Sequence, residues 1–274
     1  MEMPPEMPFD LPPGGYARGL DGQPAPGQDG EPVLWVARCA APAGTWALAR
    51  AAHRDTGWWP LLLSMPDHEV GGPSRWEEAG SYLPVQGGAP PAVHEVEALL
   101  ARCWRQSTDA GPDDHLPPEE RLAVTAPYGA VWPGLAPAAV SGRDPDATAD
   151  RCARELEGSP SVRLGLVRAG SGPRALDALG WNAPVDHGFG AQEVPAVLAD
   201  WERRFGTRVL GISGDTLTLS VAGVPVDREQ ALRVAVEHFS LCPDAVWQGT
   251  AEVETLEGYA DSIVGEETWS FWWD

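Results

Sequence analysis

The sequence contains no lysine. All 19 of its basic residues are arginines, while 40 residues are acidic, which gives a formal net charge of −21. Without lysine, the chain has neither the lysine of a Walker A loop nor one that forms a Schiff base with a substrate. A negative charge of this size repels nucleic acids and anionic membranes. We therefore expect no nucleic-acid and no membrane partner, whereas a basic protein partner is permitted.

Cysteine is sparse and badly spaced for a metal or redox site. None of the four cysteines forms the C-x-x-C pair of a zinc ribbon or thioredoxin-type site, because they stand far apart, at Cys39, Cys103, Cys152 and Cys242. The hydrolase motif G-x-S-x-G and the zinc-protease motif H-E-x-x-H are also absent. The sequence therefore predicts buried free thiols, no metal site and no cofactor.

Long apolar segments are missing as well. The longest strongly apolar run, around Trp58 to Leu63, is far too short to span a bilayer. The first residues are acidic and rich in proline, so they lack the basic and apolar regions of a signal peptide. We expect a cytoplasmic protein.

One clear folding unit extends from Val194 to Cys242. Apolar residues follow the 3.6-residue period of a helix at positions 194, 197, 198, 201 and 205. Val209 to Ile212 and Thr216 to Val221 have the composition of two strands. The turn between them, Gly214-Asp215, has glycine at its first central position, which suits type II′. A second helix follows, so the unit is predicted to be helix, hairpin, helix.

The predicted fold class is α+β (mixed α/β), a mixed sheet flanked by helices. We divide the chain into a disordered Pro/Gly-rich tail over 1–31, an N-terminal α/β subdomain over 32–158 and a C-terminal α+β domain over 159–274. A strand over 33–38, a helix over 45–55 and a strand over 58–64 form a βαβ unit, in which Pro60 indicates that the second strand starts late or lies at an edge. Whether both subdomains share one sheet is left open.

Several segments resemble an uncharacterised bacterial family, domain of unknown function 4253, which is common in actinobacteria. The clearest are RLGLVRA (163–169), DWERRFGTRVLGI (200–212), EQALRVAVEHFSLCPDAVWQG (229–249) and WSFWWD (269–274). The resemblance covers about residues 160–274. It implies a fold shared among soluble bacterial proteins, and it carries over no catalytic residue.

His238 and Cys242 are the first candidates for chemistry. They stand at positions i and i+4 of a predicted helix, a spacing that can place two metal ligands on one face. A packed histidine beside a buried thiol is the simpler explanation. Asp186 and His187 lie in a predicted loop, where the carboxylate could orient the imidazole for acid–base work. A plain turn explains that pair more simply.

A third motif is Gly170-Ser171-Gly172, which stands between a predicted strand and a predicted helix. Phosphates often meet the N-terminus of a helix at such a position. A lone G-x-G followed by proline is a weak signal, and an ordinary turn explains it more simply.

Trp272, Trp273 and Asp274 are candidates for partner binding. Neighbouring residues of a strand point to opposite faces, so at least one tryptophan is expected to be exposed unless both faces are covered. No basic residue follows Arg233, whereas nine acidic ones do: Glu237, Asp244, Glu252, Glu254, Glu257, Asp261, Glu266, Glu267 and Asp274. Aromatic residues within an acidic field can dock an arginine-rich protein surface.

These features favour a non-enzymatic cytoplasmic protein-interaction module, adaptor- or immunity-like, with an acidic face and a basic partner. The alternative is an enzyme or small-ligand binder that uses Asp186, His187 or His238 in a cleft between the two subdomains. The sequence does not define the substrate, the partner or the oligomeric state.

Overall fold

The computed structural model describes residues 5–17, 31–64, 95–109, 117–139, 141–181, 183–184, 189–190, 192–248 and 254–273. Within these residues the strands are β1 (Gly14–Tyr16), β2 (Leu34–Ala37), β3 (Trp58–Ser64), β4 (Val162–Arg168), β5 (Thr207–Ile212), β6 (Thr216–Val221) and β7 (Thr268–Trp272). The helices are α1 (Thr45–Thr56), α2 (Val96–Thr108), α3 (Pro118–Val124), α4 (Pro145–Leu156), α5 (Gly172–Leu179), α6 (Glu193–Phe205), α7 (Arg228–Leu241), α8 (Asp244–Trp247) and α9 (Leu256–Ile263).

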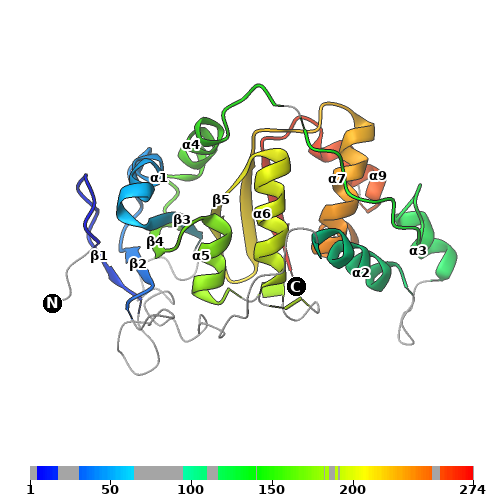
Figure 1. Ribbon diagram of the computed structural model, residues 1–274, viewed down its shortest axis with the longest axis horizontal. Helices are drawn as coiled ribbons and strands as arrows, with labels where there is room; N and C mark the ends of the chain where they lie inside the picture. The colour runs from blue at the N-terminus through cyan, green and yellow to red at the C-terminus, as the bar shows by residue number, and fades with distance from the viewer. Residues whose placement is uncertain are drawn as a thin grey trace.

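All the described strands belong to one mixed sheet, which confirms the predicted α+β class. The strand order is β1-β2-β4-β3-β5-β6-β7, so the sheet is built from both predicted subdomains (Figure 1). Among these strands, only β3 and β5 pair in parallel. Strands β2 and β3 of the predicted βαβ unit run in the same direction, because each is antiparallel to β4. They are not neighbours, since β4 lies between them.

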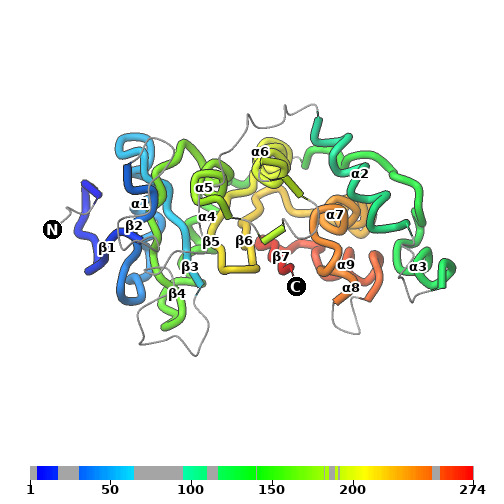
Figure 2. The backbone as a smooth tube through the Cα atoms, turned by 90° about the horizontal axis from the view of Figure 1, so that it is seen from below, coloured from blue at the N-terminus to red at the C-terminus, as the bar shows by residue number. Residues whose placement is uncertain are grey.

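Helices cover both faces of this sheet. Helices α1 and α4 pack on one face, where Trp46 and Cys152 meet alternate strand residues such as Leu62 and Leu164. Helices α5, α6 and α7 pack on the other face, over residues such as Leu61 and Val209. Figure 2 shows β1 and β2 at one end of the molecule and α2, α3, α8 and α9 at the other. The largest core lies on the face that carries α5, α6 and α7.

The helix–hairpin–helix unit is confirmed as α6, β5, β6 and α7. The predicted type II′ turn between its two strands is not confirmed. Gly214 lacks the positive φ that a type II′ turn requires at this position. The hydroxyl of Ser213 instead accepts from the backbone N–H groups of Asp215 (3.3 Å) and Thr216 (3.0 Å) and so closes the turn locally.

The predicted consequence of Pro60 is wrong, because β3 begins at Trp58 and lies inside the sheet between β4 and β5. Proline is tolerated here because β3 pairs with β5 only from Leu62 onward. The Pro60 carbonyl accepts from the Trp46 indole (3.1 Å) instead of from β5.

Two further predictions need correction. Gly14–Tyr16, which was assigned to a disordered tail, forms β1 and pairs with β2, because the edge of β2 offers free hydrogen-bonding groups. Cys39 is exposed, whereas Cys103, Cys152 and Cys242 are buried as predicted. The division of the chain into domains stays a prediction.

Candidate functional site

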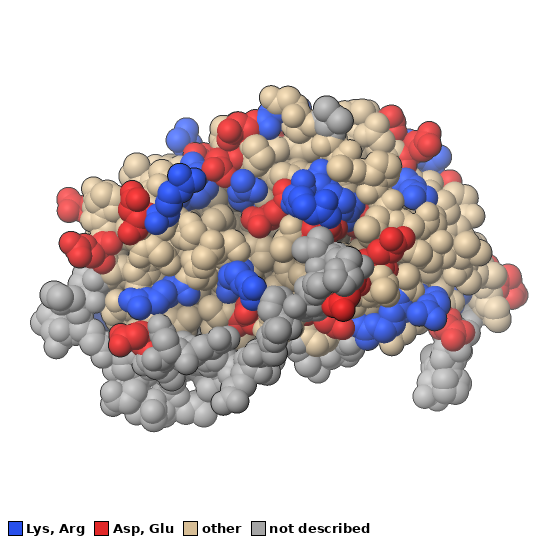
Figure 3. Space-filling model, in the orientation of Figure 1, with Lys and Arg blue, Asp and Glu red and all other residues tan. Residues whose placement is uncertain are grey.

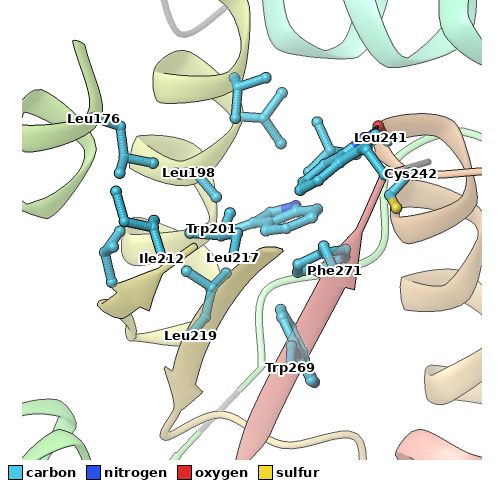
Figure 4. Packing of buried hydrophobic residues seen from close by; sticks show 14 of the residues in the cluster. Leu176, Leu198, Trp201, Ile212, Leu217, Leu219, Leu241, Cys242, Trp269 and Phe271 are labelled. Carbon is cyan, nitrogen blue, oxygen red and sulfur yellow. Dashed lines mark hydrogen bonds between the residues drawn. The ribbon is translucent and has the colours of Figure 1, made fainter. Parts of the chain in front are cut away.

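His238 lies fully buried in an aromatic cluster on the inner face of β7. Its ring contacts Trp201 at 5.0 Å, Trp269 at 4.3 Å and Phe271 at 4.9 Å between centroids. Figure 4 shows these three aromatic side chains within the core. Its Nδ1 lies 3.1 Å from the Tyr259 hydroxyl, and its Nε2 makes no hydrogen bond within the described part of the chain. Burial, with a smaller effect of Arg204, lowers the pKa of His238 to about 3. The side chain is therefore a neutral core residue.

Cys242 is buried like His238, and its thiol is engaged by the backbone. Its thiol donates to the Trp272 carbonyl (3.0 Å), and burial raises the pKa of the thiol to about 12. Across the described ranges, no group of three or more His, Cys, Asp or Glu side chains could hold a metal ion. The packed arrangement, which was the simpler explanation, is the one found.

We expect His238→Phe to reduce the acid sensitivity of the fold. In the unfolded chain the imidazole takes up a proton near its ordinary pKa of 6.5, whereas the folded chain resists protonation down to about 3. Stability is therefore lost as pH falls through this window. Between pH 7 and pH 5 the wild type should lose about 2 kcal/mol more than the variant. Urea unfolding at both pH values checks this, and equal losses would contradict it.

Glu237, one of the nine acidic residues expected near an acidic face, is instead fully buried. It accepts from the Ala136 N–H (2.7 Å) and the Trp201 indole (2.8 Å), and both its oxygens pair with Arg204. Arg204 also donates to Asp200 (2.6 Å). This buried ion network joins α6, α7 and the segment before α4. The sequence placed Asp200 and Arg204 off the apolar stripe of α6 and gave no sign of their burial.

A pocket of about 570 Å³ opens at the end of the sheet where β3 and β5 begin and β4 ends. It exists because β3 and β5 pair only at Leu62 and Leu63, so their first residues are free to separate. Trp59 of β3 and Arg208 of β5 line it, as does Gly170 after β4. Helices α1, α4 and α6 complete the walls. The pocket thus lies between residues from both predicted subdomains.

A chain of ion pairs crosses this pocket. Arg50 binds Asp150 through two contacts (2.6 and 2.8 Å) and Asp146 through a third (3.1 Å). Asp146 also accepts from Arg208 (2.9 Å), whose guanidinium lies 3.9 Å from Glu202. The charge of Asp146 is therefore balanced by two arginines. Glu202 is the last carboxylate in this row of ion pairs.

Among the titratable groups that line the pocket, Glu202 has the most clearly shifted pKa. Burial raises its pKa to about 7, Asp146 adds to the rise, and Arg208 opposes it. Near neutral pH the side chain thus exchanges a proton readily. Such a pKa suits a group that gives or takes a proton when a ligand binds.

We expect Glu202→Gln to change how stability depends on pH. A carboxyl whose folded pKa lies above the unfolded value of 4.5 contributes stability below that value and loses it as pH rises through about 7. Between pH 5 and pH 8 the wild type should lose on the order of 2 kcal/mol more than the variant. Guanidinium unfolding at the two pH values tests this. A parallel pH dependence in both proteins would show that Glu202 is ionised throughout.

Two side chains of α1 bring unused polar groups to the pocket. The Nε2 of His53 donates a hydrogen bond to the Ala169 carbonyl (2.8 Å), and Nδ1 has no hydrogen bond to a described residue. The same ring meets Trp59 edge-on at 5.0 Å. Arg54 is exposed and has no hydrogen-bond or ion-pair partner among the described residues. Both are available to a ligand.

Among the described residues, His238, Trp272 and Trp273 do not line this pocket. Asp186, His187 and Asp274 lie outside the described residues, and His238 lies in the core. Gly170, from the third motif, does line it. His53 and Glu202 were missed, because nothing local shows that the end of α1 and the last turn of α6 meet at one end of the sheet.

Trp272 and Trp273 point to opposite faces, as predicted for neighbours in a strand. Trp273 is buried, and its indole donates to the Leu241 carbonyl (3.3 Å). Trp272 is 40% exposed, and its indole donates to Asp215 (3.2 Å), which fixes its orientation. Of the two tryptophans, Trp272 is therefore the one that reaches the surface.

The surface drawn in Figure 3 carries arginines and acidic residues side by side rather than one continuous acidic field. Many of these charges are paired, as in the contact of Arg102 with Glu193 (2.8 Å). Within the described part of the chain, no helix is long and apolar enough to cross a membrane.

The family resemblance is confirmed for the C-terminal part of the chain. Residues 163–274 match the family described as Domain of unknown function (DUF4253). This range includes β4, the helix–hairpin–helix unit and β7. Comparison with curated proteins found no match, and neither did comparison with solved structures.

Proposed function

We propose that the protein binds a small polar ligand in the pocket between α1, α4, α6 and the diverging ends of β3 and β5. The observation that carries the proposal is the pocket itself: about 570 Å³, within the usual range of small-molecule sites. His53 Nδ1 and the Arg54 guanidinium supply polar groups that no other described residue engages. Glu202 adds a carboxyl that titrates near neutral pH.

This proposal keeps the expected position, a cleft between the two subdomains, with different residues. Polar groups converge there from α1, α4, α6 and β5, and Trp59 supplies an aromatic wall. Small-molecule sites commonly combine such a wall with a few placed polar groups. We infer ligand binding and assign no reaction.

The test is a variant that fills the pocket. A Cβ at Gly170 would meet no atom within 4 Å, so Gly170→Leu can place a side chain in the pocket without strain. We expect saturation-transfer NMR with amino acids, sugar phosphates, nucleotides and dicarboxylic acids to identify compounds that contact the wild type and not this variant.

The matched control is Gly214→Leu. A Cβ at Gly214 also meets no atom within 4 Å, and the position lies at the end of β5 opposite the pocket. It should bind every compound that the wild type binds. The proposal fails when no compound contacts the wild type, or when Gly170→Leu binds all of them equally well.

A second candidate function rests on Trp272. Its exposed indole, held by Asp215, resembles the rigid aromatic anchors of protein interfaces. We propose that a basic partner protein in the cytoplasm stacks an arginine on it, by cation–π contact and in the field of the net negative charge. This is the adaptor- or immunity-like function expected from the sequence.

Capture from lysate of the producing organism tests this second function. The wild type should retain a basic protein that high salt releases, and Trp272→Ala should not retain it. Val264→Ala, another change at an exposed apolar residue, serves as the control. Equal capture by wild type and Trp272→Ala would exclude Trp272 as the anchor.

A further inference from the structure

The turn between β4 and α5 carries backbone donors that nothing in the described structure uses. The N–H groups of Gly170, Ser171 and Gly172 make no hydrogen bond within the described residues. The Ser171 side chain caps Arg174 N–H (3.4 Å) and the Ser171 carbonyl accepts from Ala175, so the rest of the helix end is satisfied. Free N–H groups before a helix attract negative charge.

A buried indole provides a second donor at the same place. Trp59 is 6% exposed and lines the pocket, and its Nε1 has no hydrogen-bond partner among the described residues. The ring edge that carries Nε1 also carries Cζ2, which lies 3.1 Å from the position of a Cβ built on Gly172. This edge of the indole therefore packs beside the start of α5. Buried donors are usually paired, so an acceptor supplied by a ligand would satisfy this indole.

Of the three arginines that line the pocket, one is not engaged by a described acidic residue and could bind an anionic acceptor. Arg50 and Arg208 are both engaged by Asp146. Arg54 has no partner in the described part of the chain. Asp55, beside it, also lines the pocket and opposes an anion. A bound anion would therefore depend on the arginine and be weakened by the aspartate.

The geometry points to an oxyanion site: the ligand of the pocket carries a phosphate or carboxylate group, which accepts from the Gly170–Gly172 turn and the Trp59 indole and faces Arg54. This inference rests on the proposed function and names the chemical class of its ligand. Charge-assisted hydrogen bonds to backbone and guanidinium groups supply the affinity.

A matched set of three compounds tests it: glycerol phosphate, glycerate and glycerol. In proton–nitrogen correlation spectra of the full chain, we expect at least one of the two anions to shift the Trp59 indole and Gly170–Gly172 N–H resonances in a saturable way. Whichever anion binds more tightly identifies the group. Glycerol should leave these resonances in place. A shift with glycerol equal to that with both anions, or no shift with either anion, would overturn the inference.

Exposed variants then separate a specific site from general charge attraction. Arg54→Ala should raise the dissociation constant of the anion about tenfold. Asp55→Asn should lower it. Arg105→Ala, a change at an exposed arginine of α2, should leave it unchanged. Equal weakening by Arg54→Ala and Arg105→Ala would also overturn the inference. If only uncharged compounds bind, and Gly170→Leu abolishes their binding, the inference fails while the proposed function stands.

Discussion

Replacing Glu237 by glutamine is expected to lower the free energy of unfolding by about 3–5 kcal/mol. The carboxylate is fully buried and accepts from the Ala136 N–H, the Trp201 indole and Arg204. Glutamine keeps the shape but presents an NH₂ group to one of these donors. It also leaves the Arg204 guanidinium with less negative charge in a place that water does not reach. Denaturant unfolding at neutral pH measures the loss.

The control for this change is Glu229→Gln, which makes the same substitution on the exposed first turn of α7 and should cost less than about 0.5 kcal/mol. Arg204→Gln completes a double-mutant cycle, in which the double variant should cost clearly less than the sum of the single ones. Strictly additive losses would show that the two side chains are not coupled as their geometry requires.

Gly211→Ala is expected to destabilise the protein by about 3 kcal/mol or more, at the upper end of overpacking effects. A Cβ at this position would lie 2.2 Å from the Leu62 carbonyl oxygen and 3.1 Å from the Leu62 carbonyl carbon. Neither atom can rotate away, because both belong to the backbone of β3. The clash falls where β3 and β5 pair, so the sheet itself must open. Thermal and guanidinium unfolding will measure the effect.

Gly214→Ala, in the same hairpin, is the reference, because its Cβ would meet no atom within 4 Å. It should change stability by less than about 0.5 kcal/mol. A Gly211→Ala variant as stable as Gly214→Ala would mean that β3 and β5 separate without cost at Leu62.

The parts of the fold that the sequence predicted are those set by local patterns. The period of apolar residues along α6 and the alternation along β6 each depend on neighbours a few residues away. Helix caps are likewise set locally: the side chains of Asp227 and Thr255 accept from the N–H groups of Gln230 and Gly258. Such elements form where their own sequence directs them.

Strand order could not be predicted in this way. The insertion of β4 between β2 and β3 joins residues about a hundred or more positions apart, and no periodicity encodes it. The wrong prediction for Pro60 has the same origin. The sheet accepts a proline there because β3 begins to pair with β5 only after that position. The same applies to the pocket, whose ion pairs join Arg50 to Asp146 and Arg208 to Asp146. Only Gly170 carried a local signal, the turn before a helix.

The position of β4 also limits how the chain can be divided. The matched family range begins at residue 163, within β4, whereas both neighbours of β4 in the sheet come from residues 34–64. A chain cut to the matched range would leave both edges of this central strand without partners. Exposed apolar edges promote association between molecules. The boundaries of the family match are therefore not those of a unit that can be separated from the rest of the chain.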